Sequence, residues 1–350
     1  EEFQASDHGK AISKVGLYEI HHHENPKQEP CWWPSAPNTN VKRPLAGLKV
    51  VDLTRVIAGP AITRSLAEMG ASVMRVVAPH VADLSIVHPD LNWGKWNSFL
   101  DLRNDEDRDK LRALIIEADV VVSGYRPGVL DKWGFSEDDI LNIAKERNRG
   151  LIYARENCYG WYGPWSHRIG WQQISDANCG VSLEFGRAMG LDEAVTPVFP
   201  NSDYCTGVCG STAILDALMR RAQDGGSYTV ELSLNYYSQW LVKSVGVYPQ
   251  NVWNKVWLEN GRQVFRHFNT MSDLIPAYVD MLKENSADRV FRPSNFHTLR
   301  SKQLEVDILC PKPVLQFPGE EVELRYNVGT RTNGVDRPRW PEDLTVEVVA

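Results

Sequence analysis

The stretch LKVVDLTRVIAGPAITRSLAEMGASVMRVV, residues 48–77, decides the fold of this chain. It begins with LKVVDL at 48–53, a short apolar run rich in branched residues, and it ends with a second such run, ASVMRVV at 71–77. Between them AITRSLAEMG has a helical pattern, with Pro60 where a first-turn proline belongs and Gly70 where a C-terminal cap belongs. The stretch therefore predicts a β-α-β unit.

The same alternation continues along the chain. Strands that alternate with helices form a parallel sheet whose faces the helices cover. We therefore predict an α/β fold, a Rossmann-like parallel sheet with flanking helices, plus a smaller α+β C-terminal domain. The further strands are expected at 118–124, 150–157 and 227–234, and the further helices at 105–118, 137–148 and about 204–223.

Changes in composition suggest the domain boundaries. Residues 1–43 are polar and contain several prolines, so we predict a leader or linker there, with order beginning near Pro44. Residues 44–240 form the predicted large α/β domain, and residues 241–350 the small α+β domain with a C-terminal tail. The segment 235–305 is helical and aromatic in character, whereas residues from 314 onward are predicted as strand and turn.

Length and charge restrict the possible partners. The chain has 350 residues, and 38 Lys and Arg against 45 Asp and Glu give a formal net charge of −7. No stretch approaches the roughly 18 consecutive apolar residues of a membrane helix. The acidic balance, without a long basic run, argues against nucleic acid and against an anionic membrane surface. We expect small molecules and other copies of the same chain as partners.

Cysteine and histidine placement argues against disulfides and metal sites. The six cysteines are widely spread, so we interpret them as reduced thiols of an intracellular, cytoplasmic protein. Cys205 and Cys209 share a helix face, but no second pair completes a zinc site. The histidines at 21–23 lie in a polar stretch where solvation is expected. The chain begins at Glu1 without a signal-peptide pattern, and we leave open whether it is part of a longer protein.

Several familiar fingerprints are missing from the sequence, namely G-x-G-x-x-G, the Walker loop, G-x-S-x-G and H-E-x-x-H. Other motifs occur instead, in a fixed order, and together they resemble the class III CoA-transferase family, also called CaiB/BaiF. Those motifs are RPLAGLKVVDLTRVIAGPAITRSLAEMGASVMRV (43–76), SFLDLRN (98–104), ADVVVSGYRPGVLDKWGF (118–135), NCYGWYGP (157–164), and SDYCTG (202–207) with GGSYTVELSL (225–234).

The resemblance implies a catalytic carboxylate at Asp203, in the SDYCTG motif. Its implied role is to attack an acyl-CoA thioester, giving a mixed anhydride and then an aspartyl-CoA thioester from which an acceptor carboxylate takes the CoA. We place Asp203 directly before a long helix, whose positive end favours an ionised carboxylate. The alternative is that Asp203 only caps this helix, because aspartate is a preferred N-cap residue.

The resemblance also implies the residues that hold coenzyme A, which enters as an acyl-CoA co-substrate. Arg55 and Ile57 are expected near the pantetheine or acyl end. The side chains at three further positions have suitable chemistry: the cations Arg103 and Lys132 suit the ADP phosphates, and Tyr125 can stack on adenine. For Arg103 and Lys132 the alternative is that they belong only to a charged helix face. The remaining CoA positions are Leu100, Arg103, Tyr125 and Lys132.

A substrate pocket is predicted where the fourth strand of the α/β pattern ends. Glu156 and Asn157 lie at that edge, where ligands gather in open α/β sheets, although a turn cap is an equal alternative for them. Trp171 follows the Gly-Pro turn and lines either the acyl pocket or the core.

Departures from the family pattern keep other functions open. The stretch IGWQQISD at 169–176 lacks the histidine of the racemase branch, which argues against a racemase because that reaction needs two acid/base groups. Residues 326–341 lack a glycine cluster to close over Asp203, and without the leader the chain is short for the family. The alternatives are a CoA-independent lyase, isomerase or hydrolase, or a non-catalytic scaffold. For the main hypothesis the resemblance implies an interlocked homodimer that moves CoA between carboxylic acids.

Overall fold

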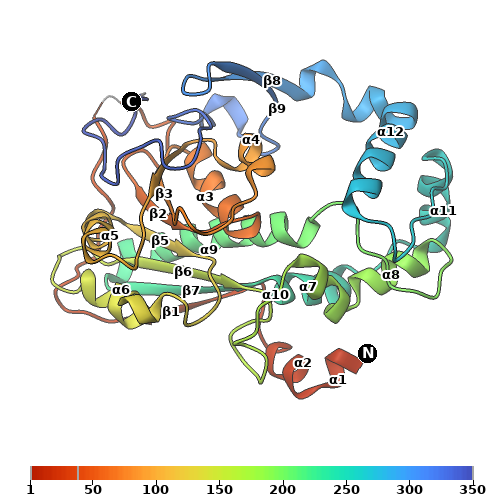
Figure 1. Ribbon diagram of the computed structural model, residues 1–350, viewed down its shortest axis with the longest axis horizontal. Helices are drawn as coiled ribbons and strands as arrows, with labels where there is room; N and C mark the ends of the chain where they lie inside the picture. The colour runs from red at the N-terminus through yellow and green to blue at the C-terminus, as the bar shows by residue number, and fades with distance from the viewer. Residues whose placement is uncertain (1, 38, 349–350) are drawn as a thin grey trace.

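A seven-stranded sheet forms the centre of the computed structural model, which describes residues 2–37 and 39–348 (Figure 1). Its order is β1-β7-β6-β5-β2-β3-β4, and every neighbouring pair is parallel except β1 with β7. The predicted α/β fold with a Rossmann-like parallel sheet is therefore confirmed. The strands are β1 (Tyr18–His23), β2 (Lys49–Leu53), β3 (Ser72–Val77), β4 (Lys95–Phe99), β5 (Val120–Ser123), β6 (Ile152–Asn157) and β7 (Ser227–Ser233).

Helices cover both faces of this sheet. Alternate residues of a strand point to opposite faces of the sheet, so the apolar residues of each strand contribute to two separate cores. Val50 and Val122 pack with α3 (Ala58–Glu68) and α9 (Asn201–Asp224). On the other face, Val51 packs with α5 (Asp105–Glu117) and α6 (Glu137–Ile143).

The N-terminal segment is part of this fold, so our expectation that order begins near Pro44 is wrong. Residues 18–23 pair antiparallel with β7 over six positions, from Tyr18 with Leu232 to His23 with Ser227. We missed this strand because most of its residues are polar. An edge strand that packs Tyr18 and Ile20 against the core needs no continuous apolar run. Before it lie α1 (Glu2–Ala5) and α2 (Asp7–Ile12), which Figure 1 shows beneath the sheet near α7.

The C-terminal region is predominantly helical and more exposed. Helices α11 (Gln250–Glu259) and α12 (Met271–Val290) stand apart from the sheet (Figure 1), and α11 has no buried residue. Two strands outside the central sheet, the half-buried β8 (Phe296–Ser301) and the more exposed β9 (Val306–Pro311), form a hairpin. The remaining helices longer than a single turn are α7 (Gln172–Cys179), α8 (Val181–Ala188) and α10 (Leu234–Trp240).

The tail beyond residue 313 differs from the prediction of strand and turn. Among its described residues there is no strand, and the tail folds back along β4 instead. The backbone N–H of Gly94 donates to the carbonyl of Val328 at 2.9 Å, and Arg331 forms buried ion pairs with Asp336 and Glu347. Side-chain contacts of this kind replace the hydrogen-bond ladder that a strand would have needed.

None of the helices in the described part of the chain combines the length and apolar character needed to cross a membrane. All six cysteines have free thiols, as predicted.

Candidate active site

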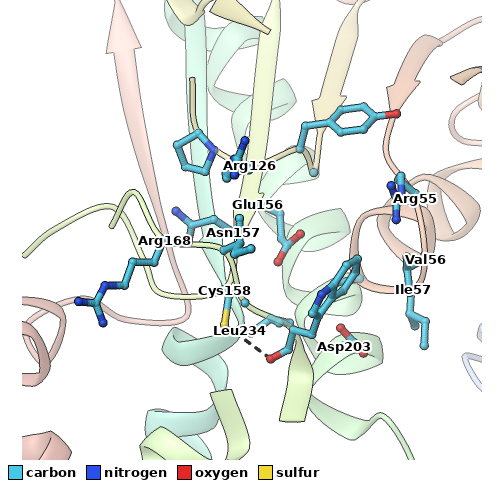
Figure 2. A pocket seen from close by; sticks show the side chains of 17 residues that line it. Arg55, Val56, Ile57, Arg126, Glu156, Asn157, Cys158, Arg168, Asp203 and Leu234 are labelled. Carbon is cyan, nitrogen blue, oxygen red and sulfur yellow. Dashed lines mark hydrogen bonds between the residues drawn. The ribbon is translucent and has the colours of Figure 1, made fainter. Parts of the chain in front are cut away.

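A cavity of about 180 Å³ opens where the parallel strands end (Figure 2). Ligands of open α/β sheets bind at this carboxyl edge, because the loops that follow neighbouring strands converge there. The loops after β2 and β5, the end of β6, the segment 168–171 and the first turn of α9 all contribute. The lining residues are Arg55, Val56, Ile57, Ala58, Gly124, Tyr125, Arg126, Pro127, Glu156, Asn157, Cys158, Arg168, Ile169, Gly170, Trp171, Asp203 and Leu234.

Seven of the ten site residues that we predicted from the sequence line this cavity. They come from five different segments, so tertiary structure alone brings them together. They are Arg55, Ile57, Tyr125, Glu156, Asn157, Trp171 and Asp203.

The other three predicted residues lie outside the cavity. Leu100 is 2% exposed and belongs to the core beneath α5. Arg103 is exposed and forms an ion pair with Asp101 at 2.6 Å. Lys132 is also exposed, with its Nζ 5.1 Å from the centre of the Trp133 ring. For Arg103 and Lys132 the assignment to CoA stays a prediction about an exposed surface, whereas the side chain of Leu100 packs in the core.

Asp203 lies inside the first turn of α9 rather than before it, because the helix begins at Asn201 and its N-cap position is Pro200. Asp203 therefore does not have the N-cap role. Burial, with a smaller contribution from the charge of Asp176, raises the pKa of the Asp203 carboxyl to about 7. We expected the helix end to favour the ionised form, but desolvation outweighs that effect here.

Asp176, which sequence reasoning missed, lies behind Asp203 on α7. Its carboxylate accepts hydrogen bonds from Ser202 Oγ at 2.8 Å, Gln172 Nε2 at 2.5 Å and Ser238 Oγ at 3.4 Å. It does not line the cavity, and burial raises the pKa of its carboxyl. Asp176 therefore acts on the pocket through its charge, which raises the pKa of both Asp203 and Cys158.

Glu156 is the second carboxyl that lines the cavity. It lies at the end of β6, is 9% exposed, and its Oε2 lies against Gly124 at the end of β5. Within residues 2–37 and 39–348 neither the Glu156 nor the Asp203 carboxyl group has a hydrogen bond or an ion pair. Burial and the charge of Asp203 raise the pKa of the Glu156 carboxyl to about 8.

The loop after β2 reaches the cavity in a strained conformation. Val56 has φ of 71°, which is unusual for a β-branched residue and marks an over-determined backbone. A buried network beneath the loop supports it, because Lys95 Nζ donates to Asp52 Oδ2 at 3.0 Å and to the carbonyl of Pro60 at 2.9 Å. Next to Val56, the guanidinium of Arg55 lies 5.9 Å from the centre of the Trp171 ring.

The segment after β6 is shaped by Asn157. Its Oδ1 accepts from the backbone N–H of Gly160 at 2.7 Å, and its Nδ2 donates to the carbonyl of Gly160 at 3.1 Å. Asn157 is therefore a turn-forming residue as well as a lining residue. Beyond it, the Cys158 thiol donates to the carbonyl of Trp171 at 3.6 Å (Figure 2), and burial raises the pKa of that thiol.

The histidines at 21–23 lie on strand β1, where His21 and His22 are exposed, as expected for solvated side chains, and His23 is half-buried. His22 stacks on Tyr228 with ring centres 4.5 Å apart. His21, Glu19 and Glu231 bring one ligand atom each within 4.8 Å of one another, a spacing that a metal ion could bridge. The guanidinium of Arg155 already pairs with Glu231, so we interpret this group as an ion-paired sheet edge.

Comparison with known proteins points to one family. The sequence profile described as CoA-transferase family III matches residues 45–269. The acetyl-coenzyme A transferase nodX of Hypoxylon pulicicidum is 56% identical over 350 residues, which cover 99% of this chain and 59% of that protein. An acyl-CoA transferase of Gibberella moniliformis is 32% identical over 93% of this chain and 58% of its own length. The chain thus spans less than two thirds of these relatives.

Solved structures share the fold at low sequence identity. A CaiB/BaiF family protein from Brucella suis superposes with a TM-score of 0.62 at 19% identity, covering 83% of this chain and 96% of that one. Rv3272 from Mycobacterium tuberculosis, in an orthorhombic crystal form, gives a TM-score of 0.61 at 20% identity, covering 86% and 98%. At such identities the likeness concerns the fold alone.

Proposed function

The chain belongs to CoA-transferase family III, and from that premise we propose that it moves coenzyme A between carboxylic acids through Asp203. The observation that carries the proposal is the position of Asp203, a carboxyl that faces the cavity at the carboxyl edge and that no described group binds. A nucleophile must be free to reach its substrate. The Asp203 pKa of about 7 leaves a large ionised fraction of that carboxyl at neutral pH.

The proposed reaction has two covalent stages. The Asp203 carboxylate attacks the thioester carbon of an acyl-CoA, the carbon–sulfur bond breaks, and a mixed anhydride forms. CoA then attacks the Asp203 carbonyl carbon, the acid of the donor leaves as a carboxylate, and an aspartyl-CoA thioester remains. A second carboxylic acid takes the CoA by the reverse sequence. This scheme needs no metal and no redox cofactor.

The cavity suits only the reacting end of acyl-CoA, because about 180 Å³ cannot enclose the nucleotide. We propose that Arg55 and Ile57 contact the pantetheine or acyl end, and that Trp171 bounds the acyl group. Tyr125 lines the same cavity on the side of the loop after β5. The nucleotide would then run outward over the surface that carries Lys132 and Arg103.

Trapping of the covalent adduct tests the proposal. The protein is incubated with a panel of acyl-CoA thioesters, quenched with hydroxylamine, and digested for mass spectrometry. We expect a hydroxamate at Asp203 that is absent from the Asp203→Asn variant. A modification at another residue, or none with any thioester of the panel, would reject the proposed function.

The same family membership leads us to propose a homodimer. We also propose a large domain at 44–240, whose sheet includes the N-terminal strand β1 (Tyr18–His23), and a small domain at 241–350. An apolar groove of about 850 Å³ between α8 and the segment 241–253 supports the dimer, because Val247 and Tyr248 are 64% and 67% exposed there. Light scattering on the purified chain decides between monomer and dimer.

A further inference from the structure

Two carboxyl groups share the cavity, although the proposed reaction has used only one of them. Glu156 comes from β6 and Asp203 from α9, and Figure 2 shows both side chains among those that line the pocket. Neither carboxyl group has a hydrogen bond or an ion pair with any described residue. Two poorly solvated carboxylates without a counter-ion repel each other, so such a pair retains a proton at a pH where separate acids would be ionised.

The surroundings decide which of the two acids keeps the proton. The three arginines that line the cavity form no ion pair with either acid, and Asp176 adds a negative charge behind Asp203. Although burial and the charge of Asp176 raise the pKa of Asp203 to about 7, burial and the charge of Asp203 itself raise the pKa of Glu156 to about 8, which favours Glu156 as the group that keeps the proton. The titratable and charged groups that face Glu156 are Arg55 after β2, Tyr125 and Arg126 after β5, Cys158 after β6, Arg168 before α7, and Asp203 on α9.

We propose that Glu156 is a second catalytic carboxyl, which gives a proton to the sulfur of coenzyme A and takes it back while Asp203 forms and breaks its acyl bonds. This inference rests on the proposed function, and it assigns to Glu156 a step that the nucleophile cannot perform for itself.

Protons and bonds balance in this scheme. In the first stage an oxygen of ionised Asp203 bonds to the thioester carbon, the carbon–sulfur bond breaks, and the proton of Glu156 moves to sulfur. The products are the mixed anhydride, a CoA thiol and ionised Glu156. In the second stage Glu156 removes the thiol proton as sulfur attacks the Asp203 carbonyl carbon. The donor acid leaves as a carboxylate, and Glu156 is protonated again.

The environment of Glu156 suits this task. Proton transfer is most efficient between groups of similar pKa, and a free thiol has a pKa of about 8.5. A solvated glutamate, with a pKa of about 4.3, would be too weak a base to remove a thiol proton. Burial of Glu156 closes that gap, because it raises the pKa of the carboxyl to about 8.

The neighbouring acids are less suited to the same role. Asp176 does not line the cavity, and three side-chain hydrogen bonds occupy its oxygens. The thiol of Cys158 lines the cavity, but burial raises its pKa far above that of a CoA thiol, so it cannot release a proton near neutral pH. Among the described groups of this pocket, Glu156 best combines contact with the cavity and a suitable pKa.

The test compares Glu156→Gln with the wild-type chain in an exchange of labelled acetate into acetyl-CoA. Glutamine keeps the size of the side chain but cannot transfer a proton, so we expect the exchange rate to fall by about 100-fold or more. A thioester of thiophenol has a leaving group that needs no protonation. The rate of Asp203 acylation is therefore measured with both donors: in Glu156→Gln it should fall by about 100-fold with acetyl-CoA but by less than about tenfold with the thiophenol thioester.

Matched variants complete the experiment. Glu117→Gln changes an exposed acid that pairs with Lys49 far from the cavity, and it should exchange at the wild-type rate. Glu156→Asp keeps a carboxyl and should retain more activity than Glu156→Gln, which keeps the test informative if glutamine disturbs folding. Thermal unfolding of each variant measures that disturbance directly.

Each contrary result has a distinct meaning. Exchange by Glu156→Gln within about threefold of wild type would overturn the inference and leave the proposed function standing. An equal loss with both thioesters would also overturn it, because a merely structural role does not depend on the leaving group. Trapping of the acyl group on Glu156 would make Glu156 the nucleophile instead. Absence of exchange and of adducts in the wild-type chain, with every acyl-CoA tested, would reject the proposed function and the inference together.

Discussion

Two buried acids at opposite edges of the sheet differ in their partners. Asp119 precedes β5 at the amino edge, is 1% exposed, and accepts from Arg149 Nε at 2.7 Å and from Arg221 Nη1 at 3.2 Å. Glu156 ends the neighbouring β6 at the carboxyl edge and has no such partner among the described residues. The fold thus satisfies one buried carboxylate and leaves the other unpaired.

This difference separates a structural role from a functional one. A buried charge that the protein pairs keeps its ionised form and ties chain segments together, as Asp119 ties β5 to α9 through Arg221. A buried acid without a partner is destabilised when ionised, so its pKa rises into the range useful for catalysis. Perturbed and unpaired groups at the ligand-binding edge therefore mark the site better than the number of charges does.

The largest expected effect on activity comes from the carboxyl edge of the sheet, where the acids have no counter-ion among the described residues. Asp203→Asn removes the proposed nucleophilic oxygen with little change in shape, so we expect CoA transfer to fall by at least about 1,000-fold. The free energy of unfolding should not decrease, because the variant loses no hydrogen bond or ion pair. Steady-state rates and urea unfolding measure the two quantities.

At the amino edge, where Asp119 is ion-paired, a substitution should lower stability and leave the transfer rate unchanged. Asp119→Ala leaves Arg221, which is fully buried, without its counter-charge, so we expect a loss of about 3–5 kcal/mol in the free energy of unfolding. The transfer rate per folded molecule should stay near that of the wild type. Urea unfolding with active-site titration checks both. A variant that unfolds like the wild type would show that the paired edge contributes little to stability.

The sequence predicted five of the seven strands of the sheet because their signals are local. The helix expected at 61–70 is Ala58–Glu68, and the strand expected at 71–77 is Ser72–Val77. Strand β4 (Lys95–Phe99) was not predicted. Strand β1 escaped prediction because its strand partner among the described residues is β7, about two hundred residues later in the chain. Its polar residues give no local signal for such a pairing.

The site was partly predictable for the same reason. Residues that follow strands, such as Arg55, Tyr125 and Glu156, converge because parallel strands end at one edge. The raised pKa of Asp203 was not predictable, because it depends on burial by segments from four other parts of the chain. Position in sequence indicates which acids reach the edge, and only the packing decides which of them are charged.

The pH dependence of the free energy of unfolding should reflect the raised pKa values of the Glu156 and Asp203 carboxyls. Both carboxyls have a raised pKa when folded, so between about pH 4 and about pH 8 the folded chain holds protons that the unfolded chain has released. Their contribution to stability is complete below the unfolded pKa and is lost as the pH rises through 7 and 8. Each unit of pKa shift corresponds to about 1.4 kcal/mol.

Glu156→Gln removes one of these groups, so its free energy of unfolding should fall less steeply over that pH range. Urea unfolding at about pH 5 and about pH 8 measures the change, with Glu117→Gln as the control that keeps the wild-type slope. An unchanged slope in Glu156→Gln would mean that Glu156 is already ionised at neutral pH, and the contrast with Asp119 would disappear.

The smallest effects are expected at the surface around the cavity. Lys132 and Arg103 are exposed, so Lys132→Ala and Arg103→Ala should change the free energy of unfolding by less than about 0.5 kcal/mol. If these cations attract the phosphates of CoA, the KM for acyl-CoA should rise a few-fold at low salt, and added salt should erase the difference because exposed charges are screened.

A short acyl thioester that lacks the nucleotide provides the matched control for that experiment. Its KM should be the same for Lys132→Ala as for the wild type, because it carries no phosphate for the lysine to attract. A fall in kcat of about 100-fold with this substrate would instead place Lys132 at the reacting atoms. That outcome would break the contrast drawn here, since an exposed cation outside the cavity would then matter as much as the buried, unpaired acids within it.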